Sequence, residues 1–193
     1  FIATTLGTLA ALGLSRPHMP YKGLIMSILI SPMIVPLIIT AAGMFFFYAR
    51  FNLVYTFTGI ILAHVALATP FVVITVTATL VGFDTNMTKA SQSLGARPTR
   101  TFFKVIMPLI LPGVISGALF AFITSFDEVV IVMFMASLDQ LTIPKQMWAG
   151  IRQEISPVIL CMATCLVVLS ILLLTTVEVL RRRSERLRGI SPR

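Results

Sequence analysis

The sequence has 193 residues, of which 57% are hydrophobic and 11% charged, and its mean hydropathy is +0.97. Soluble domains are about half apolar and about a quarter charged, so this composition excludes an ordinary soluble domain and favours a polytopic membrane protein. The net charge is +8, and such a basic balance also occurs in nucleic-acid-binding proteins. The positions of the charges must therefore decide between the two classes.

Apolar segments alternate with short polar connectors along the whole chain. Residues 1–14 are apolar but shorter than the roughly 20 residues of a full crossing, so we expect them to end a span that begins in a longer protein. Four later segments are long enough to cross a bilayer: 23–48, 57–83, 105–138 and 155–177. We expect Pro70, and Pro32 with Pro36, to kink their helices. The predicted fold class is an all-α, polytopic transmembrane helix bundle.

The basic residues are divided unevenly between alternate connectors. One set of connectors holds three: Arg50, Lys145 and Arg152. The other set holds twelve: Arg16, Lys22, Lys89, Arg97, Arg100, Lys104, Arg181, Arg182, Arg183, Arg186, Arg188 and Arg193. Connectors rich in Lys and Arg stay in the cytoplasm, so we expect residues 84–104 and the C-terminus to be cytoplasmic. The net charge then needs no nucleic acid. We divide the chain into a membrane domain, residues 1–180, and a basic tail of little fixed structure, residues 181–193.

Two start signals mark helices near the end of the chain. Thr142 followed by Ile143 and Pro144 predicts a short helix, and Trp148 within it is a residue type favoured at the lipid headgroup level. Ser156 followed by Pro157 predicts the start of the last span.

A polar segment, KASQSLGARPTRTFFKVIMP over residues 89–108, separates two apolar spans. Residues 86–104 divide into two short helical pieces, because Asn86 or Thr88 can cap the first, Gly95 can close it in the left-handed conformation, and Pro98 suits the first turn of the second.

Apolar side chains interrupt this polar segment at Leu94, Phe102, Phe103 and Val105. We expect a helix–turn–helix knob with an apolar face that has to be buried. The face could fold back on its own bundle or insert into a soluble partner.

The segment resembles the cytoplasmic loop of the membrane-spanning subunits of ATP-binding-cassette (ABC) importers, the binding-protein-dependent permeases. Their pattern is E-A-A-x-x-x-G, nine residues, then I-x-L-P. Aligned on the glycine, this chain has Lys89, Ala90, Ser91, Gly95, Val105, Met107 and Pro108, with Leu94 beside the glycine. Lys89 departs from the family by placing a base where the pattern has an acid. Other stretches, including AHVALATPFVV, SFDEVVI and LTIPKQMWAGIRQEISP, extend the resemblance and are most similar to the spermidine/putrescine branch.

The resemblance implies a type I ABC importer permease fold with six spans, of which about five are present here. It also implies a bacterial cytoplasmic (inner) membrane location and three protein partners besides the lipid bilayer: a second permease subunit, ATPase subunits and an extracytoplasmic substrate-binding protein. The chain lacks the G-x-x-x-x-G-K-[ST] phosphate-binding motif, so ATP and its magnesium ion are expected on the partner ATPase. We expect no catalytic residue, cofactor or metal in this chain, and Cys161 and Cys165 are interpreted as packed or lipid-facing side chains.

Ionisable residues inside an apolar span are costly unless they face a cavity or a partner. Asp127 and Glu128 are therefore candidates for contact with a cationic substrate. The alternative is that they hydrogen-bond the neighbouring connector or the docked binding protein. Helical spacing predicts that one stripe joins five residues: Gly113, Gly117, Phe120, Thr124 and Asp127. Thr124 and His64 complete the candidate path, although a lone histidine in a span also suits an interhelical hydrogen bond.

Two other functional classes remain open from the sequence. An intramembrane enzyme could use His64 with Asp127 or Glu128 as acid and base. An ATP-independent carrier or channel would need neither ATPase nor binding protein, but it would leave the cytoplasmic knob without a role.

Overall fold

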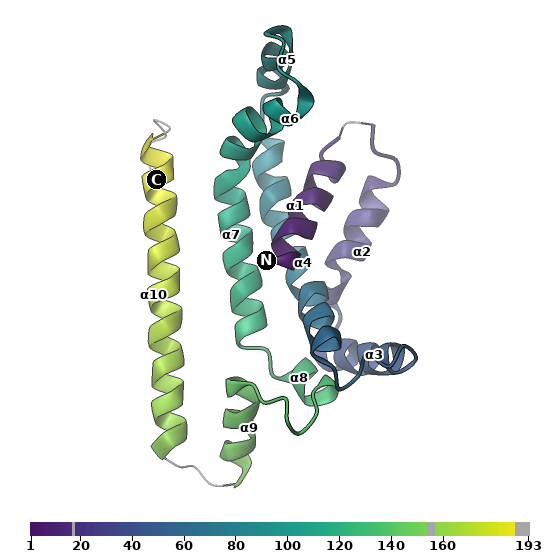
Figure 1. The fold of residues 1–193 in the computed structure, drawn as a ribbon, viewed down its shortest axis with the longest axis vertical. Helices are drawn as coiled ribbons and strands as arrows, with labels where there is room; N and C mark the ends of the chain where they lie inside the picture. Colours follow the sequence, from purple (N-terminus) through teal and green to yellow (C-terminus); the bar gives the residue numbers. More distant parts are fainter. Residues whose placement is uncertain (17, 154–156, 188–193) are drawn as a thin grey trace.

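The computed structural model describes residues 1–16, 18–153 and 157–187, and its regular elements are all helices within these ranges (Figure 1). They are α1 (Ile2–Leu14), α2 (Lys22–Ile34), α3 (Leu37–Ala49), α4 (Phe57–Val81), α5 (Thr85–Ser93), α6 (Pro98–Thr101), the π-helical segment η1 (Phe102–Ile106), α7 (Met107–Phe126), α8 (Val130–Met135), α9 (Ile143–Gln153) and α10 (Pro157–Leu187). The predicted all-α class is confirmed.

The core is built around α4, which packs against both α1 and α7 (Figure 1). Glycines let the backbones approach closely, as is common between membrane helices. A Cβ atom at Gly117 would lie 2.9 Å from the Cα of Val72, and one at Gly113 would lie 3.1 Å from the carbonyl oxygen of Thr75. The two glycines of α7 therefore fix how α7 sits on α4.

The first four members of the predicted stripe lie on α7 at helical spacing, and Thr124 lines a cavity with Phe71 of α4. Gly113 and Gly117 are buried against α4, and the Phe120 ring stacks on Phe71 of α4 with 6.3 Å between ring centroids. The helix ends at Phe126, so Asp127 lies at its C-cap and no longer on a helical face.

The segment expected to cross over residues 23–48 is two helices and not one continuous helix. The chain bends by 107° between α2 and α3. Pro32 frees the Ile28 carbonyl, which accepts a hydrogen bond from Ser31 Oγ at 2.8 Å, so α2 continues past it. Pro36 also lacks an N–H, and here the backbone of the preceding residue, Val35, is extended. The helix α2 therefore ends at Ile34. The predicted kink is thus a full break.

The expected span over residues 105–138 also ends early, because α7 stops at Phe126 and the short helix α8 follows after Glu128. The span begins earlier than predicted, because the helical run from Pro98 to Phe126 forms one apolar span of 29 residues. Within the described part of the chain, three helices are long and apolar enough to cross a membrane, or four spans result if α2 and α3 count as one. The helix α1 is apolar but shorter.

The last helix, α10, runs unbroken from Pro157 to Leu187. The expectation of little fixed structure after residue 180 is therefore wrong for residues 181–187, and residues 188–193 lie outside the described part of the chain. None of the apolar window of α10 is buried, and its neighbours are α7 and α9. Pro157 starts the helix as predicted, whereas the expected cap Ser156 is outside the described residues.

The predicted grouping of basic connectors is visible as two ends of the molecule (Figure 1). The connector from α1 to α2, the segment from α5 to α6 and the end of α10 lie together at the end that we call the basic end. α3, α8 and α9 lie at the opposite end. The two ends thus differ in charge as the sequence predicts.

Hydrogen bonds to backbone carbonyls hold the opposite end together. Tyr55 N–H donates to the Met135 carbonyl at 2.9 Å, Gln140 Nε2 donates to the Tyr55 carbonyl at 3.2 Å, and Lys145 Nζ donates to the Ser137 carbonyl at 3.1 Å. α9 begins at Ile143 with Thr142 Oγ1 accepting from Lys145 N–H at 3.4 Å, which confirms the predicted start. These bonds join the end of α8 and the connector after it to the segment just before α4 and to α9, so that the opposite end forms one hydrogen-bonded layer.

We predict that Gly117→Val destabilises the bundle, because the added side chain would meet the Val72 backbone of α4. Overpacking of this kind costs about 1–3 kcal/mol, so the thermal unfolding midpoint in detergent should fall. Gly43→Val is the matched control, since a Cβ atom at that helical position meets no atom within 4 Å. Equal unfolding midpoints for the two variants would contradict the assigned α4–α7 contact.

Candidate functional site

The polar segment between α4 and α7 forms a compact knob at the basic end (Figure 1). α5 begins at Thr85 because Asp84 caps it, with Asn86 N–H donating to Asp84 Oδ1 at 2.9 Å. The expected caps, Asn86 and Thr88, are one and three residues inside the helix. A carboxylate two residues before the first candidate was the signal that sequence reasoning missed.

Gly95 closes α5 in the left-handed conformation that the sequence predicts, with φ of +79°. Gly95 N–H donates to the Gln92 carbonyl at 2.9 Å, and Ala96 N–H donates to the Ser91 carbonyl at 3.2 Å. This pair of bonds is a Schellman motif, which satisfies the last carbonyls of a helix and reverses the chain. The turn then enters α6 with Pro98 in its first turn, as predicted.

One side-chain contact joins the two pieces of the knob. Ser91 Oγ lies 3.0 Å from Thr101 Oγ1, and Thr101 is only 1% exposed. Thr101 was not singled out from the sequence, because nothing in its neighbours distinguishes it from Thr99. The contact makes α5 and α6 one unit.

The knob presents apolar side chains outward. Leu94 is 88% exposed and Phe103 is 67% exposed, while Phe102 and Val105 are half-buried. Of the residues aligned with the family pattern, Lys89 and Ala90 are exposed on α5 and Ser91 is half-buried. Leu94 and Phe103 do not fold back on the helices of their own bundle, which was one of the two alternatives for this apolar face.

The knob joins α7 through the π-helical segment η1. Met107 N–H donates to the Phe102 carbonyl, five residues earlier, where an α-helix would bond four residues back. Val105 lies in this segment, and Met107 and Pro108 begin α7. A wider turn immediately before Pro108 makes room for the proline ring, so the helix stays continuous from the knob into the membrane.

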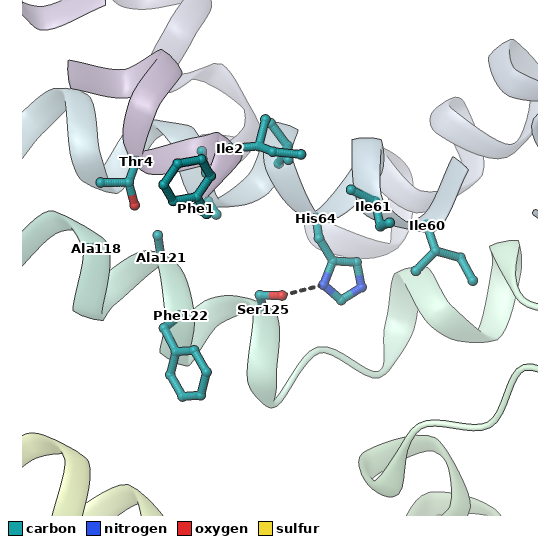
Figure 2. Close-up of a pocket in the computed structure, with 13 residues that line it drawn as sticks. Phe1, Ile2, Thr4, Ile60, Ile61, His64, Ala118, Ala121, Phe122 and Ser125 are labelled. Carbon is teal, nitrogen blue, oxygen red and sulfur yellow. Dashed lines mark hydrogen bonds between the residues drawn. The ribbon is translucent and has the colours of Figure 1, made fainter. Parts of the chain in front are cut away.

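The four candidate path residues do not share one cavity. Thr124 and Glu128 line a cavity of about 350 Å³ at the break between α2 and α3. Asp127 lines a different one of about 380 Å³, bounded by α9 and α10. His64 lines a third, of about 370 Å³, between α1, α4 and α7 (Figure 2). The structure therefore brings only Thr124 and Glu128 together.

His64 makes an interhelical hydrogen bond, which was one of its two interpretations. Its Nδ1 lies 2.8 Å from Ser125 Oγ and so links α4 to α7 (Figure 2). Ser125 had not been identified from the sequence. Since neither Asp127 nor Glu128 lines the His64 cavity, the acid–base arrangement of an intramembrane enzyme is not assembled in the described residues.

Glu128 is buried, with 7% of its surface exposed, and its Oε1 accepts a hydrogen bond from Ile131 N–H at 2.7 Å at the start of α8. Asp127, the next residue along the chain, is exposed. The two adjacent carboxylates thus have different environments. Cys161 and Cys165 are both exposed on α10.

The sequence profile of the family described as "Binding-protein-dependent transport system inner membrane component" matches residues 3–186. The spermidine/putrescine transport system permease protein PotC of Haemophilus influenzae is 30% identical over 184 residues, covering 95% of this chain and 72% of that protein. PotC of Escherichia coli is 29% identical, covering 93% of this chain and 68% of that protein. The putrescine transport system permease protein PotI of Escherichia coli is 35% identical over 103 residues, covering 53% of this chain and 37% of that protein.

We predict that Thr101→Val loosens the knob without unfolding the bundle, because it removes the bond to Ser91 Oγ but keeps the buried volume. A hydrogen bond of this kind contributes about 1 kcal/mol. Amide hydrogen exchange over residues 86–101 should become faster, while exchange in α4 stays unchanged. Ser93→Ala is the control, since the Ser93 hydroxyl bonds only within α5. Unchanged exchange in Thr101→Val would show that the contact does not hold the knob.

Proposed function

The chain belongs to the family of binding-protein-dependent transport system inner membrane components and is a permease subunit of such an importer; we propose that it carries polyamines or related organic cations and is driven by a partner ATPase. The proposed cargo rests on the relatives that transport spermidine and putrescine. The proposed location is a bacterial cytoplasmic membrane, with the basic end in the cytoplasm. Its proposed partners are ATPase subunits, a second permease subunit and an extracytoplasmic binding protein.

The exposed apolar side chains of the knob are the observation that carries the proposed coupling to an ATPase. Leu94 and Phe103 would be poorly accommodated in water, so a groove on a cytoplasmic partner is the natural place for them. The Schellman turn at Gly95 and the contact between Ser91 and Thr101 make the knob stiff. Since η1 continues into α7, a displacement of the knob would be passed to the α4–α7 pair.

The residues proposed for coupling are those of the aligned pattern. Lys89, Ala90, Ser91, Leu94 and Gly95 form the contact region. Val105, Met107 and Pro108 form the junction with the membrane. Lys89 reverses the charge of the family pattern, so the groove that receives this knob is expected to be compatible with a base at that position.

The mechanism follows from these parts. Closure of two ATPase subunits on ATP would move the knobs seated in them, and the attached helices would rotate so that the cavities between them open to one side of the membrane at a time. The hydrogen-bonded layer of α8, α9 and their connectors at the opposite end would receive the loaded binding protein. ATP hydrolysis takes place on the partner, and this chain supplies the conduit.

We predict that Gly95→Val uncouples transport. At φ of +79° a β-branched side chain is strained by about 1–2 kcal/mol, although the space around Gly95 is open, so the turn and not the packing should change. The variant should insert normally but lose co-purification with the ATPase or lose ATP-dependent uptake. Gly82→Val is the control, because Gly82 has a negative φ of −85° and ends α4. Normal uptake by Gly95→Val with its ATPase bound would reject the coupling role.

The proposed orientation has a separate test. Ser93→Cys, in a background where Cys161 and Cys165 are replaced by serine, should react with a membrane-impermeant thiol reagent only when the cytoplasmic side is accessible. The reason is that the set of connectors with twelve basic residues favours the cytoplasm. Asp139→Cys, in the connector at the opposite end, should react from the other side. Labelling of both positions from the same side would overturn the topology.

A further inference from the structure

We propose that the cavity at the break between α2 and α3 is the site where an ammonium group of the cargo is held within this subunit. The inference rests on the proposed function and deepens it. The cavity has a volume of about 350 Å³, within the range of roughly 300–1,000 Å³ that is typical of small-molecule sites. Its walls come from residues 32–37, from Leu67 and Phe71 of α4, and from Thr124 and Glu128.

Glu128 supplies a negative charge to this cavity. Its side chain is buried, and one oxygen accepts the Ile131 N–H bond, which leaves acceptor capacity because a carboxylate has about four acceptor positions. A neutral glutamine has the same length and could accept the same N–H at the start of α8 without the cost of a buried charge. Capping therefore does not explain why the residue is charged. Lys, Arg and His are absent from the described residues that line the cavity.

The end of α2 adds further acceptors. Pro36 has no N–H, so the Pro32 carbonyl, four residues earlier, loses its helical donor, and the carbonyls of Met33 and Ile34 belong to the same last turn. A helix C-terminus carries a partial negative charge. Broken membrane helices use such carbonyls to bind cations. Residues 32–34 of this last turn line the same cavity as Glu128.

The rest of the lining suits the carbon chain of an organic cation rather than a hydrated metal ion. Phe71 offers an aromatic ring, whose face attracts cations, and it is held by stacking on Phe120. Thr124 offers a hydroxyl, and Leu67 and Leu37 are apolar. Charge, dipole, ring and apolar surface in one cavity match an alkyl ammonium group.

The first experiment uses the complete importer with its ATPase and binding protein. Glu128→Gln keeps a carbonyl oxygen that can accept the Ile131 N–H, but it removes the charge. We expect spermidine uptake to fall by about 10- to 100-fold, the loss typical of one charge-assisted hydrogen bond. ATPase co-purification and basal ATP hydrolysis should be retained. Asp127→Asn, which removes the adjacent, exposed carboxylate that lines a different cavity, should leave uptake nearly unchanged.

The second experiment measures binding by thiol labelling, which does not depend on transport. Met33→Cys, in the background lacking Cys161 and Cys165, places a thiol in the cavity wall. Spermidine should slow its reaction with a thiol reagent several-fold, whereas an alkane diol of the same length should not. Adding Glu128→Gln should abolish the protection.

The outcomes separate the two proposals. Wild-type uptake by Glu128→Gln, or equal labelling of Met33→Cys with and without spermidine, would overturn the cavity assignment while leaving the importer function intact. Protection by spermidine in a complex that shows no ATP-dependent uptake would support the cavity and count against ATP-driven transport.

Discussion

The close packing of α4 on α7 is the contact on which the rest of the structure depends. Gly113 and Gly117 bring the α7 backbone against Thr75 and Val72, at distances that no larger residue would allow. The knob lies at one end of this pair and Glu128 at the other, so a rigid contact between the two helices connects the proposed energy input with the proposed cargo site. In a bilayer, where apolar surface gains little from being buried against protein instead of lipid, such close approach is the main source of helix association.

Local departures from regular helix lie where the function requires them. The π-helical turn before Pro108 keeps the knob continuous with α7, and the break at Pro36 leaves the last turn of α2 in the wall of a cavity. Each departure would be costly in lipid unless the freed groups found partners or a polar cavity. Ser31 supplies such a partner for the carbonyl freed by Pro32, whereas the carbonyls freed near Pro36 have the Glu128 cavity beside them. Proline thus frees one carbonyl that Ser31 occupies and, four residues later, frees a second carbonyl beside the proposed binding cavity.

Adjacent carboxylates illustrate how strongly the environment decides a role. Asp127 and Glu128 follow each other at the end of α7, and either was a candidate for a cationic ligand. The end of the helix turns them to different sides, so that Asp127 is exposed beside α9 and α10 while Glu128 is buried beside α2 and α3. His64 belongs to a third cavity and is engaged by Ser125. A set of polar residues that could have formed one path, or one acid–base pair, is thus distributed over three places.

The sequence by itself determined the helical class, the basic end, the left-handed turn at Gly95 and the starts of α6, α9 and α10. These features follow from the length of apolar runs, the positions of charges and the conformational limits of glycine and proline, all of which are local properties of the chain. Residues aligned with the family pattern also located the knob. Only the tertiary structure decided that residues 23–48 bend by 107°, that α7 ends before Asp127, that α10 continues to Leu187, and that Thr101 and Ser125 are contact residues. These features depend on which distant side chain fills or leaves a neighbouring space, and such contacts between segments far apart in the chain leave no periodic signal in the sequence.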